Sequence, residues 1–267
     1  MYDLGDMGDL RLSGGARGLV ALLTPGATAL AVYTPWDFDT LRQDRAGTIP
    51  VTAAGQVVGQ MRDVSGFGNH ATAIADANRM QVAEGSGLRW IAFDGVAGVY
   101  STPTINPGAA DKVQVFAAIR KLSDAAVGFL LEYSPSIDVN NGAFRVLAPH
   151  SAVPGYQFAS RGTATAFAQV SSGYAAPITN VLTGVGDIAA DTAILRANGT
   201  QVASSAVDQG IGAFLSYQAF IGSRGGLNSF FNGLLYALVV RWGTTNLSAA
   251  QIAQVERLLA PRAGLAF

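Results

Sequence analysis

The segment TAILRANGTQVASS (192–205) decides the fold class, because its pattern is that of two short strands joined by a tight turn. Asn198 and Gly199 separate the two runs. A two-residue hairpin turn needs positive φ angles at its central positions, and an Asn-Gly pair adopts them readily. The segment therefore predicts a β-hairpin and, with it, an antiparallel sheet.

Similar strand patterns recur on both sides of this hairpin, each bounded by Gly, Pro, Asn or Asp. The run KVQVFAAIRK (112–121) alternates, which places Val113, Val115, Ala117 and Ile119 on one face. The other strong strand patterns cover residues 88–93, 127–133, 143–148, 216–223 and 231–242. The 32 glycines suit a chain rich in turns and bulges. Without any strand–helix alternation, these patterns predict an all-β antiparallel sandwich.

One amphipathic helix is predicted at the C-terminus, over residues 248–260. Ser248 is a good N-cap, and Gln251 three residues later completes a capping box. Pro261 ends the helix. The predicted apolar stripe consists of Ile252, Val255, Leu258 and Leu259. We expect this stripe to pack on the sandwich.

The first 25 residues differ in composition from the rest, since they are rich in glycine and aspartate and show little periodicity. Such a segment is typical of a flexible arm that becomes ordered against a partner. We therefore predict an arm over residues 1–25, used for docking, and one sandwich domain over residues 26–267.

Charge and cysteine content exclude several classes of protein. Charged residues make up 13% of the chain, against a usual ~25%, and the net charge is -1. Nucleic-acid binding requires clustered lysines and arginines, but Lys112 and Lys121 are the only lysines and the arginines are scattered. Cysteine is absent, so no disulfide framework is expected. A weakly charged surface favours assembly with other copies, and we expect a homo-oligomer.

The apolar run at 18–33 is the only candidate for a targeting or membrane segment. It follows three aspartates rather than a basic start, and Pro25 and Gly26 interrupt it. It is also too short to cross a bilayer. We predict no signal peptide and no membrane insertion.

Signals of catalysis are nearly absent. Glycoside hydrolysis needs two neighbouring carboxylates, and the chain has three glutamates, none with an alternating acidic spacing. Glu132, with Asp138 six residues later, is the best candidate pair, although a solvated strand residue is the simpler interpretation of Glu132. A nucleophile elbow and phosphate-binding glycine motifs are missing. The sequence predicts a non-enzymatic protein, with a polysaccharide-degrading enzyme as the alternative.

The loop RDVSGFGNHATA (62–73) concentrates polar side chains and glycines. Asp63, Asn69 and Asp94, the last from a neighbouring FDG turn, are hard oxygen ligands of the kind that Ca²⁺ prefers. The simpler interpretation is a structural turn in which Asx side chains bond to local backbone, with His70 in a packing role. Both interpretations stay open here, and no cofactor other than Ca²⁺ is expected.

Aromatic residues beside turns are candidate sugar-stacking platforms. Trp36, Tyr100 and Tyr156 are the glycan-binding candidates among them. The alternative for each is ordinary packing inside the sandwich.

Several motifs together resemble a known family. RDVSGFGNHATA (62–73), GLRWIAFDGV (87–96) and FNGLLYALVVRW (231–242), followed by LSAAQIAQVERLL (247–259), are similar to the laminin-G/concanavalin A-like jelly-roll domain of tailed-phage, prophage and gene-transfer-agent proteins. The resemblance covers about residues 29–262. Two departures remove acidic residues: VAG (96–98) follows FDG, and the last strand reads LLYALVV. These departures weaken the case for a Ca²⁺ or sugar site of the family type.

The resemblance implies a jelly-roll sandwich in a virion structural protein, such as a head spike, a head fibre or a tail-fibre component. It also implies attachment to host surface polysaccharide, contacts with other virion proteins and a location in the particle after synthesis in the host cytoplasm.

Overall fold

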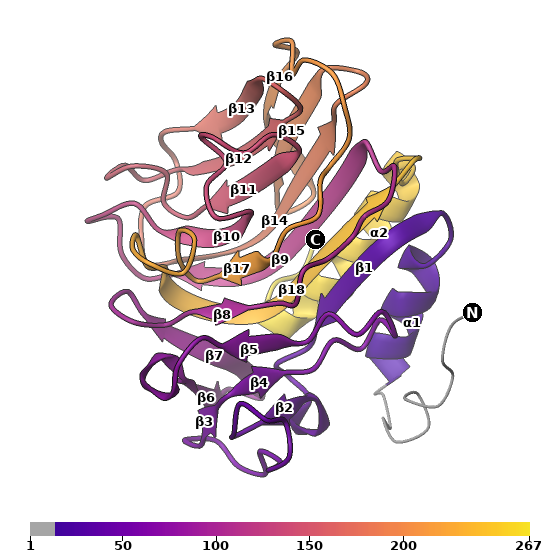
Figure 1. The fold of residues 1–267 in the computed structure, drawn as a ribbon. Helices are drawn as coiled ribbons and strands as arrows, with labels where there is room; N and C mark the ends of the chain where they lie inside the picture. The colour runs from indigo at the N-terminus through magenta and orange to yellow at the C-terminus, as the bar shows by residue number, and fades with distance from the viewer. Residues whose placement is uncertain (1–13) are drawn as a thin grey trace.

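The computed structural model describes residues 14–267 and contains two β-sheets packed face to face, with two helices on the outside of one sheet (Figure 1). All strand pairs within these sheets are antiparallel. The predicted all-β sandwich with a C-terminal helix is therefore confirmed.

The first sheet is built around two long neighbouring strands, β9 (Lys112–Lys121) and β18 (Asn232–Gly243). Its spatial order is β16 (Thr200–Ser205), β15 (Thr192–Ala197), β14 (Ile178–Asp187), β9, β18, β7 (Leu88–Asp94), β6 (Met80–Gly85) and β3 (Val57–Val58). Strand β1 (Ala27–Tyr33) pairs with the second half of β18, beyond the part that pairs with β7.

The second sheet is made of shorter strands. Its spatial order is β13 (Thr165–Val170), β12 (Tyr156–Arg161), β11 (Ala143–Leu147), β10 (Phe129–Tyr133), β17 (Ala219–Ile221), β8 (Tyr100–Ser101), β5 (Ala71–Ala73), β4 (Gln60–Met61) and β2 (Leu41–Arg42). Short 3-10 helices, η2 (Phe38–Thr40), η3 (Asp76–Asn78) and η4 (Ala260–Ala263), lie in the connections and after the last α-helix.

The predicted hairpin forms as β15 and β16, with φ angles of 48° at Asn198 and 79° at Gly199. Strand β9 also follows its predicted alternation. Its odd-numbered apolar residues join the core between the sheets, whereas Phe116 and Ala118 point to the opposite side. The central strands of the first sheet, β9 and β18, are consequently buried on both faces.

The outer cover of the first sheet includes α2 (Ala249–Leu259), which begins at the predicted capping box of Ser248 and Gln251. Val255 and Leu259 are buried as expected, but Leu258 is 37% exposed. The residue buried beside Val255 is instead Glu256, whose carboxylate accepts hydrogen bonds from Arg196 and Thr183. The predicted apolar stripe therefore wrongly included Leu258.

The helix α1 (Gly14–Leu23) corrects the prediction of an arm over residues 1–25. Ala16, Leu19 and Leu23 are buried and pack in the same cluster as Val255 and Leu259 of α2. The helix forms despite its glycines because the sheet and α2 cover its apolar face. The remaining part of the predicted arm, residues 1–13, lies outside the described residues.

The C-terminal end of α1 is held by the buried Arg241 of β18. Its guanidinium donates to the carbonyls of Leu23 and Pro25, and also to Gln114 and Thr245. A cation suits this place because the carbonyls at a helix C-terminus carry partial negative charge. Among residues 14–267, no helix is both long and apolar enough to cross a membrane.

Candidate functional site

The loop over residues 62–73 is a closed structural turn. Asp63 is 2% exposed, and its Oδ1 accepts hydrogen bonds from the backbone N–H groups of Val32 and Ser65, both at 2.9 Å. Its Oδ2 accepts from the N–H of Asn69 at 3.0 Å and lies 2.7 Å from the Ser65 hydroxyl. Gly66 and Gly68 have the positive φ angles, 86° and 77°, that the turn needs. The turn interpretation is confirmed.

The same hydrogen bonds decide how well the loop suits a cation. Burial raises the pKa of Asp63, while the hydrogen bonds from Ser65, Val32 and Asn69 oppose this shift. The Asn69 amide donates to the Leu30 carbonyl at 2.9 Å, which ties the loop to β1. His70 accepts from the backbone N–H of Asp63 through Nδ1. With both oxygens engaged and shielded from solvent, Asp63 does not fit as a Ca²⁺ ligand.

Asp94, the third residue of the proposed cation site, closes a turn of its own. Its Oδ1 accepts from the N–H groups of Val96 and Ala97 at 2.8 and 2.9 Å. Burial alone would raise the pKa of Asp94, but these backbone donors hold it below its usual range. Within the described part of the chain, no group of three or more His, Asp or Glu side chains is arranged to hold a metal ion.

Two of the three predicted glycan platforms are core residues. Tyr100 and Tyr156 have no exposed surface, so neither ring can stack on a sugar. The Tyr100 hydroxyl donates to the Val58 carbonyl, and the Tyr156 hydroxyl donates to Asn180. Both predictions are wrong, because a position beside a turn does not decide which way an aromatic side chain points, and here each strand directs the ring into the sandwich.

Trp36 is the predicted platform that keeps some exposed surface. It borders a cavity of about 670 Å³ between the β6–β7 turn and η4. The guanidinium of Arg262 lies 4.8 Å from its ring centroid and covers part of that ring. A role for Trp36 in glycan binding stays a prediction.

The outward face of the second sheet carries a group of charged side chains, because strand alternation points them away from the core. In β11, Phe144 and Val146 face the core, and Arg145 between them faces outward. Arg145 lies opposite Glu132 of β10, and Leu147 lies opposite Phe129. Neither helix covers this face (Figure 1).

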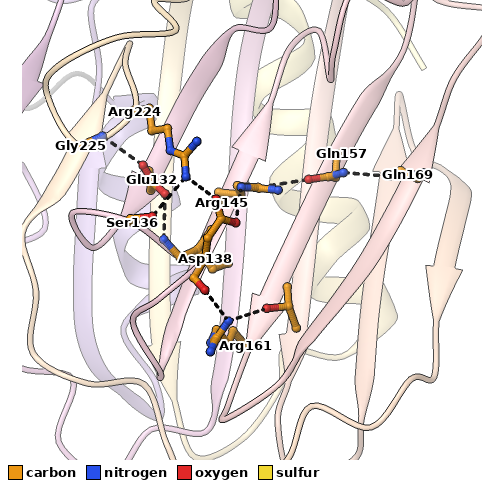
Figure 2. A network of polar contacts seen from close by, with 11 residues as sticks. Glu132, Ser136, Asp138, Arg145, Gln157, Arg161, Gln169, Arg224 and Gly225 are labelled. Atoms are coloured by element: carbon orange, nitrogen blue, oxygen red, sulfur yellow. Dashed lines mark hydrogen bonds and ion pairs between the residues drawn. The ribbon is translucent and has the colours of Figure 1, made fainter.

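Arg145 and Arg224 converge on one carboxylate. Arg145 Nη1 lies 3.2 Å from Asp138 Oδ1, and Arg224 Nη2 pairs with the other oxygen of Asp138 (Figure 2). Both guanidinium groups also lie over the Phe129 ring, 5.5 and 5.6 Å from its centroid. We call Phe129, Glu132, Asp138, Arg145 and Arg224 the arginine site.

Glu132 is the buried member of the arginine site, and its carboxylate bonds to the backbone. Its side chain is fully buried, and its two oxygens accept from the N–H of Ile137 at 2.9 Å and the N–H of Gly225 at 3.0 Å. Burial raises the pKa of Glu132, and the nearby Arg224 and Arg145 oppose that shift. Because these bonds hold the two loops that carry Asp138 and Arg224, Glu132 acts as a positioning residue. The expectation of a solvated strand residue is wrong.

A chain of amides fixes Arg145 from the other side. Arg145 Nε donates to Gln157 at 3.1 Å, and the Gln157 amide donates to Gln169 at 2.8 Å (Figure 2). Burial lowers the pKa of Arg145, and Asp138 and Glu132 oppose this shift. Arg161 adds a third cation, donating to the Asp138 carbonyl at 3.1 Å.

A shallow cavity of about 280 Å³ opens at the arginine site. Its lining combines the two arginines and Asp138 with Gln157, Ser151 and Ser229, and with apolar Phe129, Leu147 and Val127. Preorganised arginines beside hydroxyl and amide groups suit the binding of a polar ligand with negative charge. The three arginines around the site exceed its two carboxylates by one charge.

Sequence reasoning found Glu132 and Asp138 but missed the arginines. Alternation in AFRVLA (143–148) would have placed Arg145 outward. No local signal marks Arg224, which meets Asp138 from 86 residues away.

Comparisons with known proteins support the fold. No protein-family model and no curated protein matches the chain. The ligand-binding domain of botulinum neurotoxin serotype D, solved with N-acetylneuraminic acid, aligns with a TM-score of 0.56 at 12% identity, over 89% of this chain and 52% of that one. The binding domain of botulinum neurotoxin DC, solved with SialylT, aligns with a TM-score of 0.54 at 12% identity, over 73% of this chain and 48% of that one.

The chain thus spans about half the length of these two solved domains. The CBM40 domain of the Ruminococcus gnavus IT-sialidase aligns with a TM-score of 0.44 at 16% identity, over 58% of this chain and 97% of that domain. At such identities the botulinum domains show the fold alone, and that fold is the jelly-roll β-sandwich expected from the sequence.

Proposed function

We propose that this protein is a non-enzymatic glycan-binding protein and that its sandwich binds surface polysaccharide at the arginine site. The observation that carries the proposal is the pair Arg145 and Arg224, held over a cavity on the uncovered face of the second sheet. Sugars offer many hydroxyl groups, and fixed guanidinium and amide donors bind them with little loss of side-chain freedom. The botulinum domains of similar fold were solved with sialic-acid ligands, which is consistent with such a role.

The arrangement of Glu132 supports binding rather than hydrolysis. A glycosidase needs one carboxyl group to protonate the leaving oxygen and a second to act on the sugar carbon or on water. Here both Glu132 oxygens accept backbone hydrogen bonds, and both Asp138 oxygens pair with arginines. The competing function, polysaccharide cleavage, predicts a fall in polymer viscosity that Glu132→Gln abolishes.

We further propose that the protein is a structural component of a phage or gene-transfer-agent particle, such as a head spike or fibre, and attaches that particle to its host. This part is supported by the sequence resemblance and by the low surface charge, which favours a homo-oligomer and contacts with other virion proteins. Synthesis in the host cytoplasm and a final place in the virion follow from that role.

A glycan array followed by calorimetric titration tests the binding function. We expect Arg224→Ala to weaken binding of the array's best glycan by about tenfold or more, since a hydrogen bond to a charged group contributes about 1.5–3 kcal/mol. Arg257→Ala, on the exposed side of α2, is the matched control and should bind like the wild type.

A parallel Trp36→Ala variant locates the site. Loss of binding in Trp36→Ala, with Arg224→Ala unaffected, would move the site to the larger cavity beside η4. A blank array at high protein concentration would contradict glycan binding altogether.

A further inference from the structure

We infer that the ligand of the arginine site is a sugar bearing a carboxylate, and that its carboxylate replaces that of Asp138 between Arg145 and Arg224. This inference rests on the proposed glycan-binding function and assigns its chemical class.

The contacts of Asp138 show what fits between the two arginines. Its two carboxylate oxygens pair with different guanidinium groups, Oδ1 with Arg145 and Oδ2 with Arg224. The guanidinium groups are therefore spaced to hold the two oxygens of one carboxylate. Arginine is the side chain best suited to such planar recognition.

Asp138 is also the most accessible member of this trio. Its side chain is 49% exposed, against 35% for Arg224 and 12% for Arg145. On leaving the arginines, the Asp138 carboxylate would regain water, whereas the shielded Arg145 would need a new anion. An incoming carboxylate meets that need.

The backbone around Asp138 is held by bonds that do not use its side chain. Glu132 holds the N–H of Ile137, and Arg161 donates to the Asp138 carbonyl. The neighbouring turn is closed by hydrogen bonds from the N–H groups of Val139 and Asn140 to the Ser136 carbonyl. Rotation of the Asp138 side chain alone can therefore free the arginines while the loop keeps its shape.

The surroundings favour a sugar over a simple anion. Beside the two arginines, the cavity presents the hydroxyl groups of Ser151 and Ser229, and it is also lined by Gln157, whose amide bonds to Arg145 and Gln169. These groups suit the ring hydroxyls of a saccharide whose carboxylate lies between the guanidinium groups. The net positive charge of the three arginines and two carboxylates favours an acidic ligand over a neutral one.

Calorimetric titration of the full chain with matched saccharides tests this inference. The probes are 3′-sialyllactose, its methyl ester, lactose and an oligogalacturonate. The first and last distinguish a sialic acid from a hexuronate as the source of the carboxylate, and the ester removes the charge while leaving the sugar. We expect binding of at least one acidic probe, a loss of about tenfold or more on esterification, and weaker binding at high salt.

The variant Asp138→Asn tests whether the ligand displaces the Asp138 carboxylate from the two arginines or only contacts it. It removes the competing internal carboxylate, so a larger share of the protein is ready to bind, and affinity for the acidic probe should rise by about threefold or more. Arg224→Gln should lose that binding, and Arg257→Gln should not. Far-UV circular dichroism and the melting temperature show whether each variant is folded.

The outcomes are distinct. Equal binding of the acid and its ester, or binding of neutral glycans alone, would overturn the acidic ligand while leaving glycan binding intact. Weaker binding by a folded Asp138→Asn variant would overturn the displacement of Asp138. Absence of binding to these probes and to the glycan array would overturn the proposed function itself.

Discussion

Asp63 and Asp94 show how the surroundings of one residue type decide its role. Burial raises the pKa of Asp63, whereas backbone donors in an open turn hold the pKa of Asp94 below its usual range. In the sequence both are simply acids in glycine-containing loops, with Gly66 three residues after Asp63 and Gly95 directly after Asp94. Asp63 is buried because β1 packs over it, whereas the Asp94 side chain is exposed to solvent.

The lowered pKa of Asp94 predicts a pH-dependent contribution to stability. A depressed folded-state pKa gives stability that is complete above the unfolded pKa, about 3.9, and is lost as the pH falls through the folded-state pKa. We expect Asp94→Asn to melt at a lower temperature than the wild type at neutral pH, with a difference that shrinks below about pH 3.9.

Thermal unfolding across this pH range measures the difference. Asp39→Asn, another exposed aspartate, controls for loss of surface charge. A difference between Asp94→Asn and the wild type that grows on acidification would contradict the predicted sign.

At the scale of single elements, strong local sequence signals were sufficient to predict the structure. The β15–β16 hairpin, the alternation of β9 and the capping box of α2 depend on residues close together in the chain. Helix α1 could not be predicted in this way. Three of its ten residues are glycines, which disfavour a helix by about 1 kcal/mol each relative to alanine. It forms because Leu19 and Leu23 are buried against the first sheet and α2.

Helix α1 therefore depends on its tertiary contacts. Leu19 is 1% exposed, so Leu19→Ala should lower the free energy of unfolding by about 2–5 kcal/mol through lost burial and the resulting cavity. Chemical denaturation checks this value. Arg17→Ala, on the exposed side of α1, should change stability by about 0.5 kcal/mol or less. Equal small effects of both substitutions would show that the helix contributes little to the fold.

At the scale of the whole molecule, the two sheets differ in what lies on their outer faces. Helices α1 and α2 lie on the outer face of the first sheet, whereas neither helix covers the outer face of the second sheet (Figure 1). The arginine site lies on this uncovered face. An N-terminal deletion that includes α1 removes part of the cover of the first sheet. Removing residues 1–25 takes away α1 and the two carbonyls that pair with Arg241.

We therefore expect the deletion of residues 1–25 to lower the melting temperature strongly or to abolish soluble expression. Deletion of residues 1–13 leaves α1 in place and is the proper test of docking on a particle. A 1–25 deletion that melts like the full chain would show that α1 is dispensable. Normal incorporation of the 1–13 deletion into particles would contradict a docking role for these residues.

By itself, the sequence left the loop over residues 62–73 open between a structural turn and a cation site, but it determined the fold class, the hairpin and the C-terminal helix. Each depends on neighbouring residues, whose backbone preferences and periodicity can be read along the chain. Only the tertiary structure decided which aromatics are buried, that α1 forms, and that Arg145 and Arg224 share Asp138. These outcomes depend on contacts between residues tens of positions apart, such as the pair of Asp138 and Arg224, and no local pattern encodes them.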